Sequence, residues 1–208
     1  MPRLFTPFRQ RNERKKDTQH IGQAEELRGE RVYIRPPCFE ELSFIRALWA
    51  DPETMEPVGG PHHLPEARAK TWFASMVDPG NLTNCYCLIF NQENIPIGEI
   101  SFQRWNQRER SAELNIKVLA KYRSNGYGMD ALRTFIAWFF GPVGGGMMTD
   151  NVALDNQRGQ QLLLTLGFER DADISDVCML LITKQIFISK YGEPTKCFAV
   201  DRAGAYLR

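Results

Sequence analysis

The sequence predicts an α/β fold in which helices flank a mixed, largely antiparallel sheet. Three short β-rich runs follow one another at residues 85–90, 96–102 and 111–119, with links too short for crossover helices. Amphipathic helix patterns lie before and after these runs along the chain. With 208 residues, 43% of them hydrophobic and 25% charged, the chain is long enough to bury one core. The predicted element order is β-α-α-β-β-β-α-β-α-β-β.

The first half of the predicted domain contains one strand and two helices before the β-rich runs. Residues 30–37, ERVYIRPP, alternate and close on prolines, which predicts a strand. A first helix ends at Asp51-Pro52, and residues 55–65 form a glycine–proline loop. Pro65 suits the start of a second helix. The predicted inner positions of the two helices are Phe39, Leu42, Ile45 and Trp49, then Ala69, Trp72, Phe73 and Met76.

The second half continues with helix, strand, helix and strand. Residues 127–140 carry a helical apolar stripe that GPVGGG ends, and residues 147–154 are typical of a strand. Asp155 is the predicted cap of a helix that bears Leu162, Leu163 and Leu166, with Gly167 at its left-handed end. Residues 176–183, DVCMLLIT, predict a last strand. The pattern after it assigns no element.

The chain divides into a basic leader (1–28), one domain (29–190) and a tail (191–208). Residues 1–16 carry six basic residues and one acidic residue, although the net charge of the chain is only +1. Such an arm can touch nucleic acid or a membrane surface, but no base-stacking aromatics are interleaved with it, and a solvated leader is favoured. Without a signal peptide or an apolar span, and with five cysteines, the sequence predicts a cytoplasmic protein with free thiols and no membrane partner.

The segment from Lys117 to Gly128, KVLAKYRSNGYG, joins a strand to the start of a helix and carries the chemistry. Gly126 and Gly128 let the backbone turn tightly and approach a ligand. Successive amides and the helix N-terminus then converge on one point, which predicts a pyrophosphate site. Arg123 is positioned to add a charge-assisted bond. The segment is neither a Walker loop nor a dinucleotide fingerprint.

At these residues the sequence resembles the GNAT superfamily of N-acetyltransferases. Arg123, Gly126 and Gly128 match its R-x-x-G-x-G acetyl-CoA motif after a strand. Asn156 begins a second match, NQRGQQLLLTLGF, similar to the helix that closes over the pantetheine arm. The resemblance covers about residues 30–185. The pattern is most similar to the branch of the ribosomal-protein alanine acetyltransferases.

The resemblance implies acetyl-CoA as co-substrate and a set of residues that hold it. Backbone groups of Lys117, Val118 and Leu119 would pair with pantetheine like an added strand. Asn156 would bond the pantetheine or lie near the thioester; its alternative role is a helix cap, and the two are compatible. No metal is expected, because His62 and His63 lack a third ligand nearby. The amides expected at the pyrophosphate belong to Arg123, Ser124, Asn125, Gly126, Tyr127 and Gly128.

Catalysis needs a base, because an amine attacks a thioester only when neutral. The candidates are Glu113 and Glu99 on neighbouring predicted strands, and Glu113 is preferred because family members often place a base on its strand. Many members also carry a tyrosine seven residues after the asparagine, which protonates the coenzyme A thiolate, and some carry a serine three residues after it. Those positions are Leu163 and Gly159 here, so the helix offers no proton donor and water is the expected source.

The predicted function is transfer of an acetyl group from acetyl-CoA to a primary amine by direct attack on the thioester. The acceptor is either a small-molecule amine or a protein N-terminus, and a homodimer is left open. The alternative is an acyl-CoA-binding sensor or scaffold, which the missing donor supports. A nucleic-acid-associated protein recruited by the basic leader is a third hypothesis and is not favoured.

Overall fold

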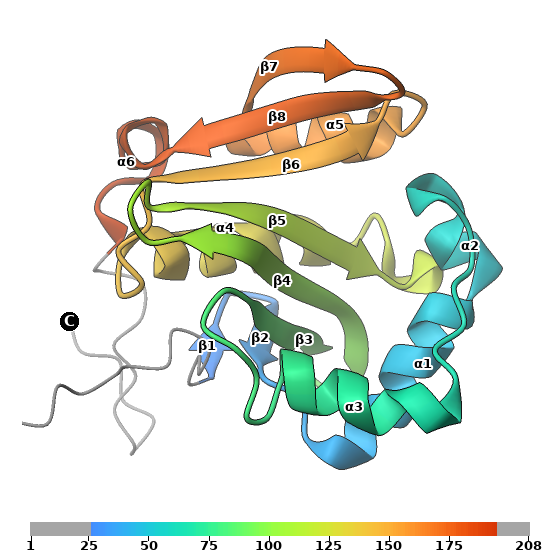
Figure 1. Ribbon diagram of the computed structural model, residues 1–208. Coiled ribbons are helices and arrows are strands. Elements are labelled where there is room, and N and C mark those ends of the chain that lie inside the picture. Colours follow the sequence, from blue (N-terminus) through green and yellow to red (C-terminus); the bar gives the residue numbers. More distant parts are fainter. Residues whose placement is uncertain (1–25, 195–208) are drawn as a thin grey trace, which may run out of the picture.

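The computed structural model describes residues 26–194, which form one mixed sheet with helices on both faces (Figure 1). The order of the eight described strands is β1-β2-β3-β4-β5-β6-β8-β7. Every neighbouring pair is antiparallel except β5 and β6, which are parallel. The predicted fold class is therefore confirmed. The strands are β1 (Leu27–Arg28), β2 (Val32–Arg35), β3 (Cys85–Asn91), β4 (Pro96–Asn106), β5 (Ser111–Val118), β6 (Met147–Ala153), β7 (Glu169–Ile174) and β8 (Val177–Thr183).

Helices connect the strands at both ends of the sheet. The α-helices are α1 (Leu42–Ala50), α2 (Pro52–Met55), α3 (Glu66–Met76), α4 (Tyr127–Phe140), α5 (Gln157–Leu166) and α6 (Lys184–Tyr191). Short 3-10 turns lie at η1 (Phe39–Glu41), η2 (Glu56–Val58) and η3 (Ala120–Tyr122). No helix within residues 26–194 is long and apolar enough to cross a membrane.

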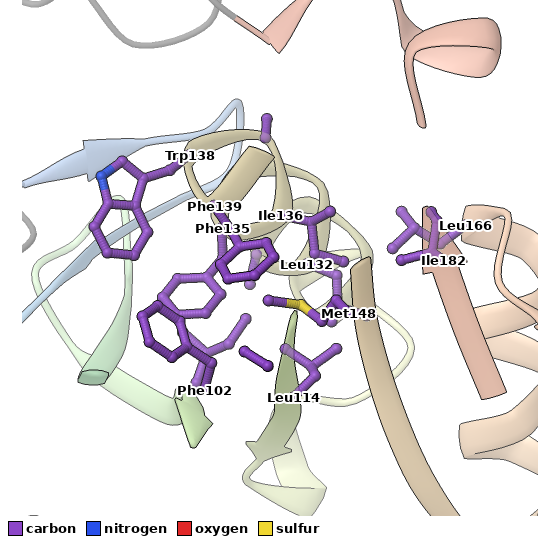
Figure 2. Packing of buried hydrophobic residues seen from close by; sticks show 14 of the residues in the cluster. Phe102, Leu114, Leu132, Phe135, Ile136, Trp138, Phe139, Met148, Leu166 and Ile182 are labelled. Atoms are coloured by element: carbon purple, nitrogen blue, oxygen red, sulfur yellow. The ribbon is translucent and has the colours of Figure 1, made fainter. Parts of the chain in front are cut away.

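Two apolar clusters lie on opposite faces of the sheet. The larger joins α4, α5 and α6 to the strands and is dense in aromatic rings, among them Phe102, Phe135 and Phe139 (Figure 2). The smaller lies under α1 and α3 and includes Ile45, Phe73 and Tyr86. Neighbouring residues of a strand face opposite sides, so residues of β4 and β5 alternate between the larger cluster and the face covered by α1 and α3.

Several elements differ from the sequence prediction. The short α2 begins where a loop was expected to follow the first helix, and β1, β7 and α6 were not assigned to residues. Phe39 was expected on the inner face of that helix but lies in η1, with 46% of its surface exposed. Asp155 was expected to cap α5, whereas Asn156 is the N-cap. These are short or local features, where tertiary contacts outweigh the pattern.

The expected domain limits differ from the structure by a few residues. Leu27 and Arg28, assigned to the leader, form β1 and pair with β2. Tyr191, assigned to the tail, ends α6. Residues 1–25, which carry the basic charges of the leader, and residues 195–208 lie outside the described residues.

The parallel pair β5–β6 separates after three residues. Ser111, Ala112 and Glu113 pair with Met147, Met148 and Thr149, and no later residue of β5 pairs with β6. Beyond this point the two strands diverge towards their C-terminal ends (Figure 1). We call this divergence the fork, and the residues at its closed end, Glu113, Thr149 and the following Asp150, its apex. The fork leaves one edge of β5 without a partner strand in the described part of the chain.

Candidate active site

The unpaired edge of β5 carries backbone groups that a ligand can bond. The Leu119 amide donates to the Ile97 carbonyl of β4 at 2.9 Å, which fixes the side to which Leu119 turns. Successive residues of a strand direct their backbone N–H and C=O groups to opposite edges. Those of Lys117 therefore also point towards β4, and those of Val118 point into the fork. By the same alternation, Leu114 and Ile116 face the fork. Of the three residues expected to pair with pantetheine, only Val118 therefore turns its backbone towards the fork.

The turn after β5 leads directly into the N-terminus of α4. Gly126 is the N-cap of α4 with φ = 80°, and Ser124 is also left-handed with φ = 66°. The Asn125 side chain holds the turn by donating to the carbonyls of Tyr122 (3.3 Å) and Arg123 (3.0 Å). The first amides of a helix have no intrahelical acceptor and carry its positive dipole end. The turn therefore has the backbone geometry on which the predicted anion site depends.

The Arg123 side chain has a different role from the expected phosphate contact. Its guanidinium donates to the carbonyls of Thr54 (2.7 Å) and Glu53 (3.3 Å), and its Nε donates to that of Val118 (3.2 Å). The Thr54 hydroxyl in turn accepts from the Ala120 amide at 2.9 Å. Arg123 therefore docks α2 against the turn and shapes it, and its side chain is taken up by carbonyl oxygens.

Two other arginines lie beside the turn. A Cβ added at Gly126 would lie 3.4 Å from Cδ and Nε of Arg31, which places the Arg31 side chain over the start of α4. Arg158, on α5, donates a hydrogen bond to the hydroxyl of Ser124. Both arginines are exposed. Sequence analysis missed them because they come from the β1–β2 turn and from α5, and only the fold brings them to the turn before α4.

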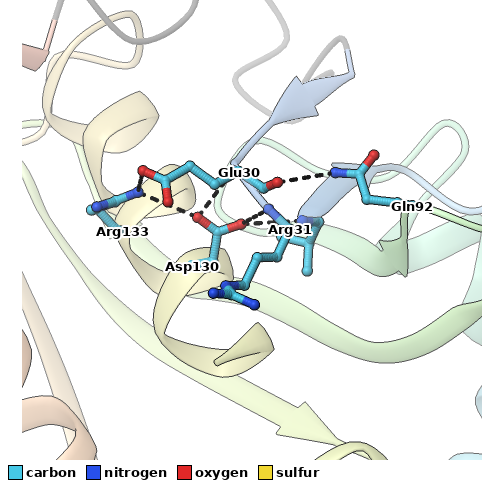
Figure 3. A network of polar contacts seen from close by, with 6 residues as sticks. Glu30, Arg31, Gln92, Asp130 and Arg133 are labelled. Carbon is cyan, nitrogen blue, oxygen red and sulfur yellow. Dashed lines mark hydrogen bonds and ion pairs between the residues drawn. The ribbon is translucent and has the colours of Figure 1, made fainter. Parts of the chain in front are cut away.

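Asp130 fixes the backbone that carries Arg31 (Figure 3). Its buried carboxylate accepts from the amides of Glu30 (3.2 Å), Arg31 (2.7 Å) and Val32 (3.1 Å). The approach is so close that a Cβ on Gly29 would lie 2.4 Å from a carboxylate oxygen of Asp130. Bonds to an ionised acceptor are stronger than neutral ones, so the β1–β2 turn is held firmly against the first turn of α4.

Asn156 caps α5 at the other side of the fork. Its side-chain oxygen accepts from the Gly159 amide at 2.9 Å, so the capping role that the sequence left open is present. A Cβ on Gly159 would lie 2.7 Å from the Asn156 amide nitrogen, so a serine at that position would displace the cap. Leu162 of α5 packs near Gly128, 3.5 Å from where its Cβ would be. α5 therefore lies close against the start of α4, beside the fork.

Glu99 is buried in a polar cluster on the face covered by α1 and α3. One oxygen accepts from Lys117 Nζ at 2.7 Å, and the other accepts from Trp49 Nε1 at 2.7 Å and from the Tyr86 hydroxyl. The side chain is 3% exposed, and that of Lys117 is 13% exposed. Burial, followed by the nearby Glu99 carboxylate, raises the pKa of Tyr86 well above its usual value. Three donors occupy Glu99, and this arrangement suits a structural ion pair better than a base.

Glu113 lies at the apex of the fork and is more accessible. Its side chain is 32% exposed and forms a 2.6 Å ion pair with Arg104, which is 79% exposed. On β5 it lies opposite Gln103 of β4 and beside Thr149 of β6. Water and an acceptor can therefore reach its carboxylate, which the buried Glu99 does not allow.

Asp150 is a carboxylate at the apex that sequence analysis did not single out. It follows Thr149, the last residue of β6 that pairs with β5. Burial, and next the Glu113 carboxylate, raise the pKa of Asp150 to about 7, against smaller opposing effects of the Asn151 amide and Lys117. In the sequence, Asp150 is one acidic residue within a strand pattern. It can be recognised as a candidate only when the structure shows which residues of that strand face the core.

The remaining residues of interest are two histidines and two cysteines. His62 and His63 are exposed, and the His62 ring lies 5.7 Å from that of Trp49. Trp49 and Trp72 meet edge to face with centroids 5.1 Å apart, so the His62 loop borders an aromatic cluster next to Glu99. Cys85 and Cys87 are buried, as expected of core residues.

In this site an unpaired strand edge leads directly to the N-terminus of a helix. Such a class of site suits a ligand with an amide-containing arm that ends in phosphates. Comparison with known proteins agrees with this class. A family model described as "Acetyltransferase (GNAT) domain" matches residues 31–169. The chain belongs to the GNAT acetyltransferase family.

Individual relatives are distant. The "Uncharacterized N-acetyltransferase YoaA" of Bacillus subtilis (strain 168) is 27% identical over 75 residues, 36% of this chain and 42% of that protein. The chain thus matches less than half the length of this relative. Among solved structures, spermidine N-acetyltransferase from Vibrio cholerae in complex with CoA and spermine superposes with a TM-score of 0.68 at 16% identity, over 76% of this chain and 98% of that one. A GNAT-family acetyltransferase from Bacillus anthracis gives a TM-score of 0.65 at 17% identity, over 77% and 99%. At these identities the structures show a shared fold.

Proposed function

We propose that this protein transfers the acetyl group of acetyl-CoA to a primary amine by direct attack of the amine on the thioester. The observation that carries the proposal is the fork, because its unpaired β5 edge leads directly to the left-handed turn at the N-terminus of α4. An edge of unpaired amides and carbonyls suits the two amides of a pantetheine arm. The helix N-terminus suits the pyrophosphate at the other end of that arm.

The residues present fit acetyl-CoA along its whole length. The amides of residues 124–128 bind the pyrophosphate, because the expected Arg123 amide already donates to the Ala120 carbonyl at 3.1 Å. Arg31 and Arg158 lie at the turn to balance the negative charge. Leu114, Ile116 and Val118 present backbone groups to the pantetheine. The thioester then lies near the apex of the fork, and Asn156 flanks it as the cap of α5.

Glu113 accepts the proton that the amine must lose, directly or through a water molecule. A lysine-like amine has a pKa of about 10.4 and an α-amine one of about 7.7–8.0, so both are largely protonated at neutral pH. Glu113 is at the apex, is partly exposed and forms an ion pair with Arg104. This makes it the base, and Glu99 the buried partner of Lys117.

The acceptor is a small-molecule amine or a protein N-terminus. The fold neighbour from Vibrio cholerae is a spermidine N-acetyltransferase, which makes polyamines the first compounds to test. Resemblance to the ribosomal-protein alanine acetyltransferases makes alanyl peptides the second. We propose a panel of polyamines, amino acids, aminoglycosides and peptides, assayed by release of the CoA thiol. Binding of CoA without thiol release from any of them would favour the sensor alternative.

We expect Gly126→Val to weaken CoA binding at least tenfold, about 1.4 kcal/mol. The side chain would occupy the space of the phosphates and press against Arg31, 3.4 Å from the added Cβ. Isothermal titration calorimetry with CoA measures the effect.

The matched control is Gly144→Val, in the loop between α4 and β6. Gly144 has φ = 79° against 80° for Gly126, so both variants carry the same backbone strain. Only the change at Gly126 is expected to alter CoA affinity. Equal losses in the two variants would show that strain, and not the phosphate site, is responsible.

A further inference from the structure

We propose that Asp150 is the acid that protonates the departing CoA thiolate. This inference rests on the proposed function and supplies the donor that α5 lacks. At the position where many family members carry a tyrosine, this chain has Leu163, which is 2% exposed and packs in the main core. The sequence leaves water as the expected source, so a side-chain donor has to come from another element that reaches the apex of the fork.

The first support is the place of Asp150 in its strand. Met148 and Val152, two residues before and after it, are both buried in the main core. Opposite Asp150 on β8 lies Leu180, which is fully buried, and the next core-facing pairs join Met148 to Ile182 and Val152 to Cys178. Asp150 is thus a carboxylate in a row of apolar side chains. Ionisation of a carboxyl in such a row opposes folding, so a role in function is the better explanation.

The second support is that this row ends at the fork. β5 and β6 pair up to Glu113 and Thr149, and Asp150 is the next residue on β6. An arm that runs from the turn at Gly126 back along Val118, Ile116 and Leu114 brings its far end to this apex. α5 covers the same face of β6 and belongs to the same core cluster. The reactive sulfur is therefore expected within reach of the Asp150 carboxyl.

The third support is the environment of the Asp150 carboxyl at the apex, next to Glu113. Burial and the Glu113 charge raise the pKa of Asp150 to about 7, and the Asn151 amide and Lys117 offset only part of this rise. Glu113 forms a 2.6 Å ion pair with Arg104. A carboxyl that retains its proton beside an ion-paired carboxylate suits an acid and a base in one reaction. At neutral pH about half of the Asp150 population carries the proton that a thiolate of pKa about 8.5 accepts readily.

The step balances as follows. Glu113 removes one proton from the ammonium form, and the neutral amine nitrogen forms a bond to the thioester carbonyl carbon. The C–S bond breaks, its electron pair leaves with sulfur, and sulfur takes the proton of Asp150. The second amine proton returns to Asp150 through water, and Glu113 releases its proton to solvent. The products are the amide, the CoA thiol and one proton for each ammonium consumed.

The first experiment uses CoA alone and needs no acceptor. Ultraviolet absorbance of the thiolate gives the pKa of the thiol of bound CoA in the parent, in Asp150→Asn and in Asp171→Asn, a control at an exposed carboxylate of β7. Above pH 7 the Asp150 carboxylate opposes a second negative charge, so we expect the thiol pKa to be at least one unit lower in Asp150→Asn than in the parent. Asp171→Asn should match the parent.

The outcomes separate the inference from the proposed function. Equal thiol pKa values in the parent and Asp150→Asn, with CoA bound to both, would overturn the role of Asp150 and leave the acetyl-CoA site intact. Failure of the parent to bind CoA in calorimetry would overturn the proposed function itself, and this inference with it.

A second readout needs no ligand at all. The unfolded chain binds the Asp150 proton with a pKa of about 3.9, whereas the folded chain holds it with a pKa of about 7. The contribution of this group to stability is therefore full below about pH 4 and is lost as the pH rises to about 7. We expect Asp150→Asn to gain in Tm relative to the parent across that window. Parallel Tm curves would show that Asp150 is already ionised at neutral pH and is no donor.

The kinetic test uses the amine of the panel with the fastest thiol release. We expect kcat of the parent to fall above about pH 7, as Asp150 loses its proton, and Asp150→Asn to be about tenfold slower at pH 7 and without this fall. Glu113→Gln should move the fall to lower pH, because the charge that raises the Asp150 pKa is gone. If instead the increase of kcat with pH on the acidic side of the profile disappears in Asp150→Asn, Asp150 is the base, and its role as donor is overturned.

Discussion

Replacing Glu113 by glutamine is expected to lower kcat/KM on the order of 10²-fold while acetyl-CoA affinity stays intact. The change keeps the size of the side chain and removes its ability to accept a proton. The deficit relative to the parent should shrink as the pH approaches the pKa of the acceptor amine, because the neutral amine then forms without help. Steady-state kinetics from pH 7 to about pH 10 measure this recovery.

The control for Glu113→Gln is Glu109→Gln, an exposed carboxylate in the turn between β4 and β5. It removes the same charge a few residues from the apex, so it should leave kcat/KM unchanged. A Glu113→Gln variant that is as slow, relative to the parent, at pH 10 as at pH 7 would show that Glu113 is not the base.

Replacing Glu99 by glutamine is expected to destabilise the fold by about 3–5 kcal/mol, because it leaves the buried Lys117 ammonium without its counter-charge. Glu113→Gln breaks an ion pair of similar length at an exposed position and should cost at most about 1 kcal/mol. Urea denaturation followed by circular dichroism measures both free energies of unfolding. The contrast tests whether the two glutamates, which the sequence offered as alternatives, divide into a structural and a catalytic role.

The double variant Glu99→Gln/Lys117→Met is the control for the buried pair. It removes both charges, so most of the lost stability should return. A Glu99→Gln variant that remains as stable as the parent, and whose kcat/KM falls at pH 7 and recovers at high pH, would contradict this division. Glu99 would then be the base.

The sequence determined the elements that the backbone builds locally. Periodicity located the helix at residues 127–140, and the structure places α4 at the same bounds. Gly167 was predicted to be left-handed from its place at a helix end, and its φ is 118°. Gly126 was predicted to allow a tight turn, and its φ is 80°. The motif around Gly126 predicts an anion site from local backbone geometry alone, because a glycine turn before a helix directs free amides towards one point.

Only the tertiary structure decided what each polar side chain faces. Glu99 and Glu113 look alike in sequence, but Glu99 lies beneath α1 and pairs with Lys117, whereas Glu113 lies where β5 and β6 part. Arg123 has the spacing of a phosphate ligand, yet the docking of α2 gives its guanidinium three carbonyl partners. Strand register and helix docking are long-range properties that a local pattern does not contain.

Asp150 shows the same limit most clearly. In the sequence it is one acidic residue in MMTDNVAL, with nothing to mark it. Its significance depends on three distant facts: that β6 pairs with β8 in the core, that β5 leaves β6 just before it, and that Leu163 of α5 offers no proton. Local chemistry predicts where an anion binds, since backbone amides and a helix dipole suffice; where a proton goes depends on burial and neighbouring charge, which arise only when the chain is folded.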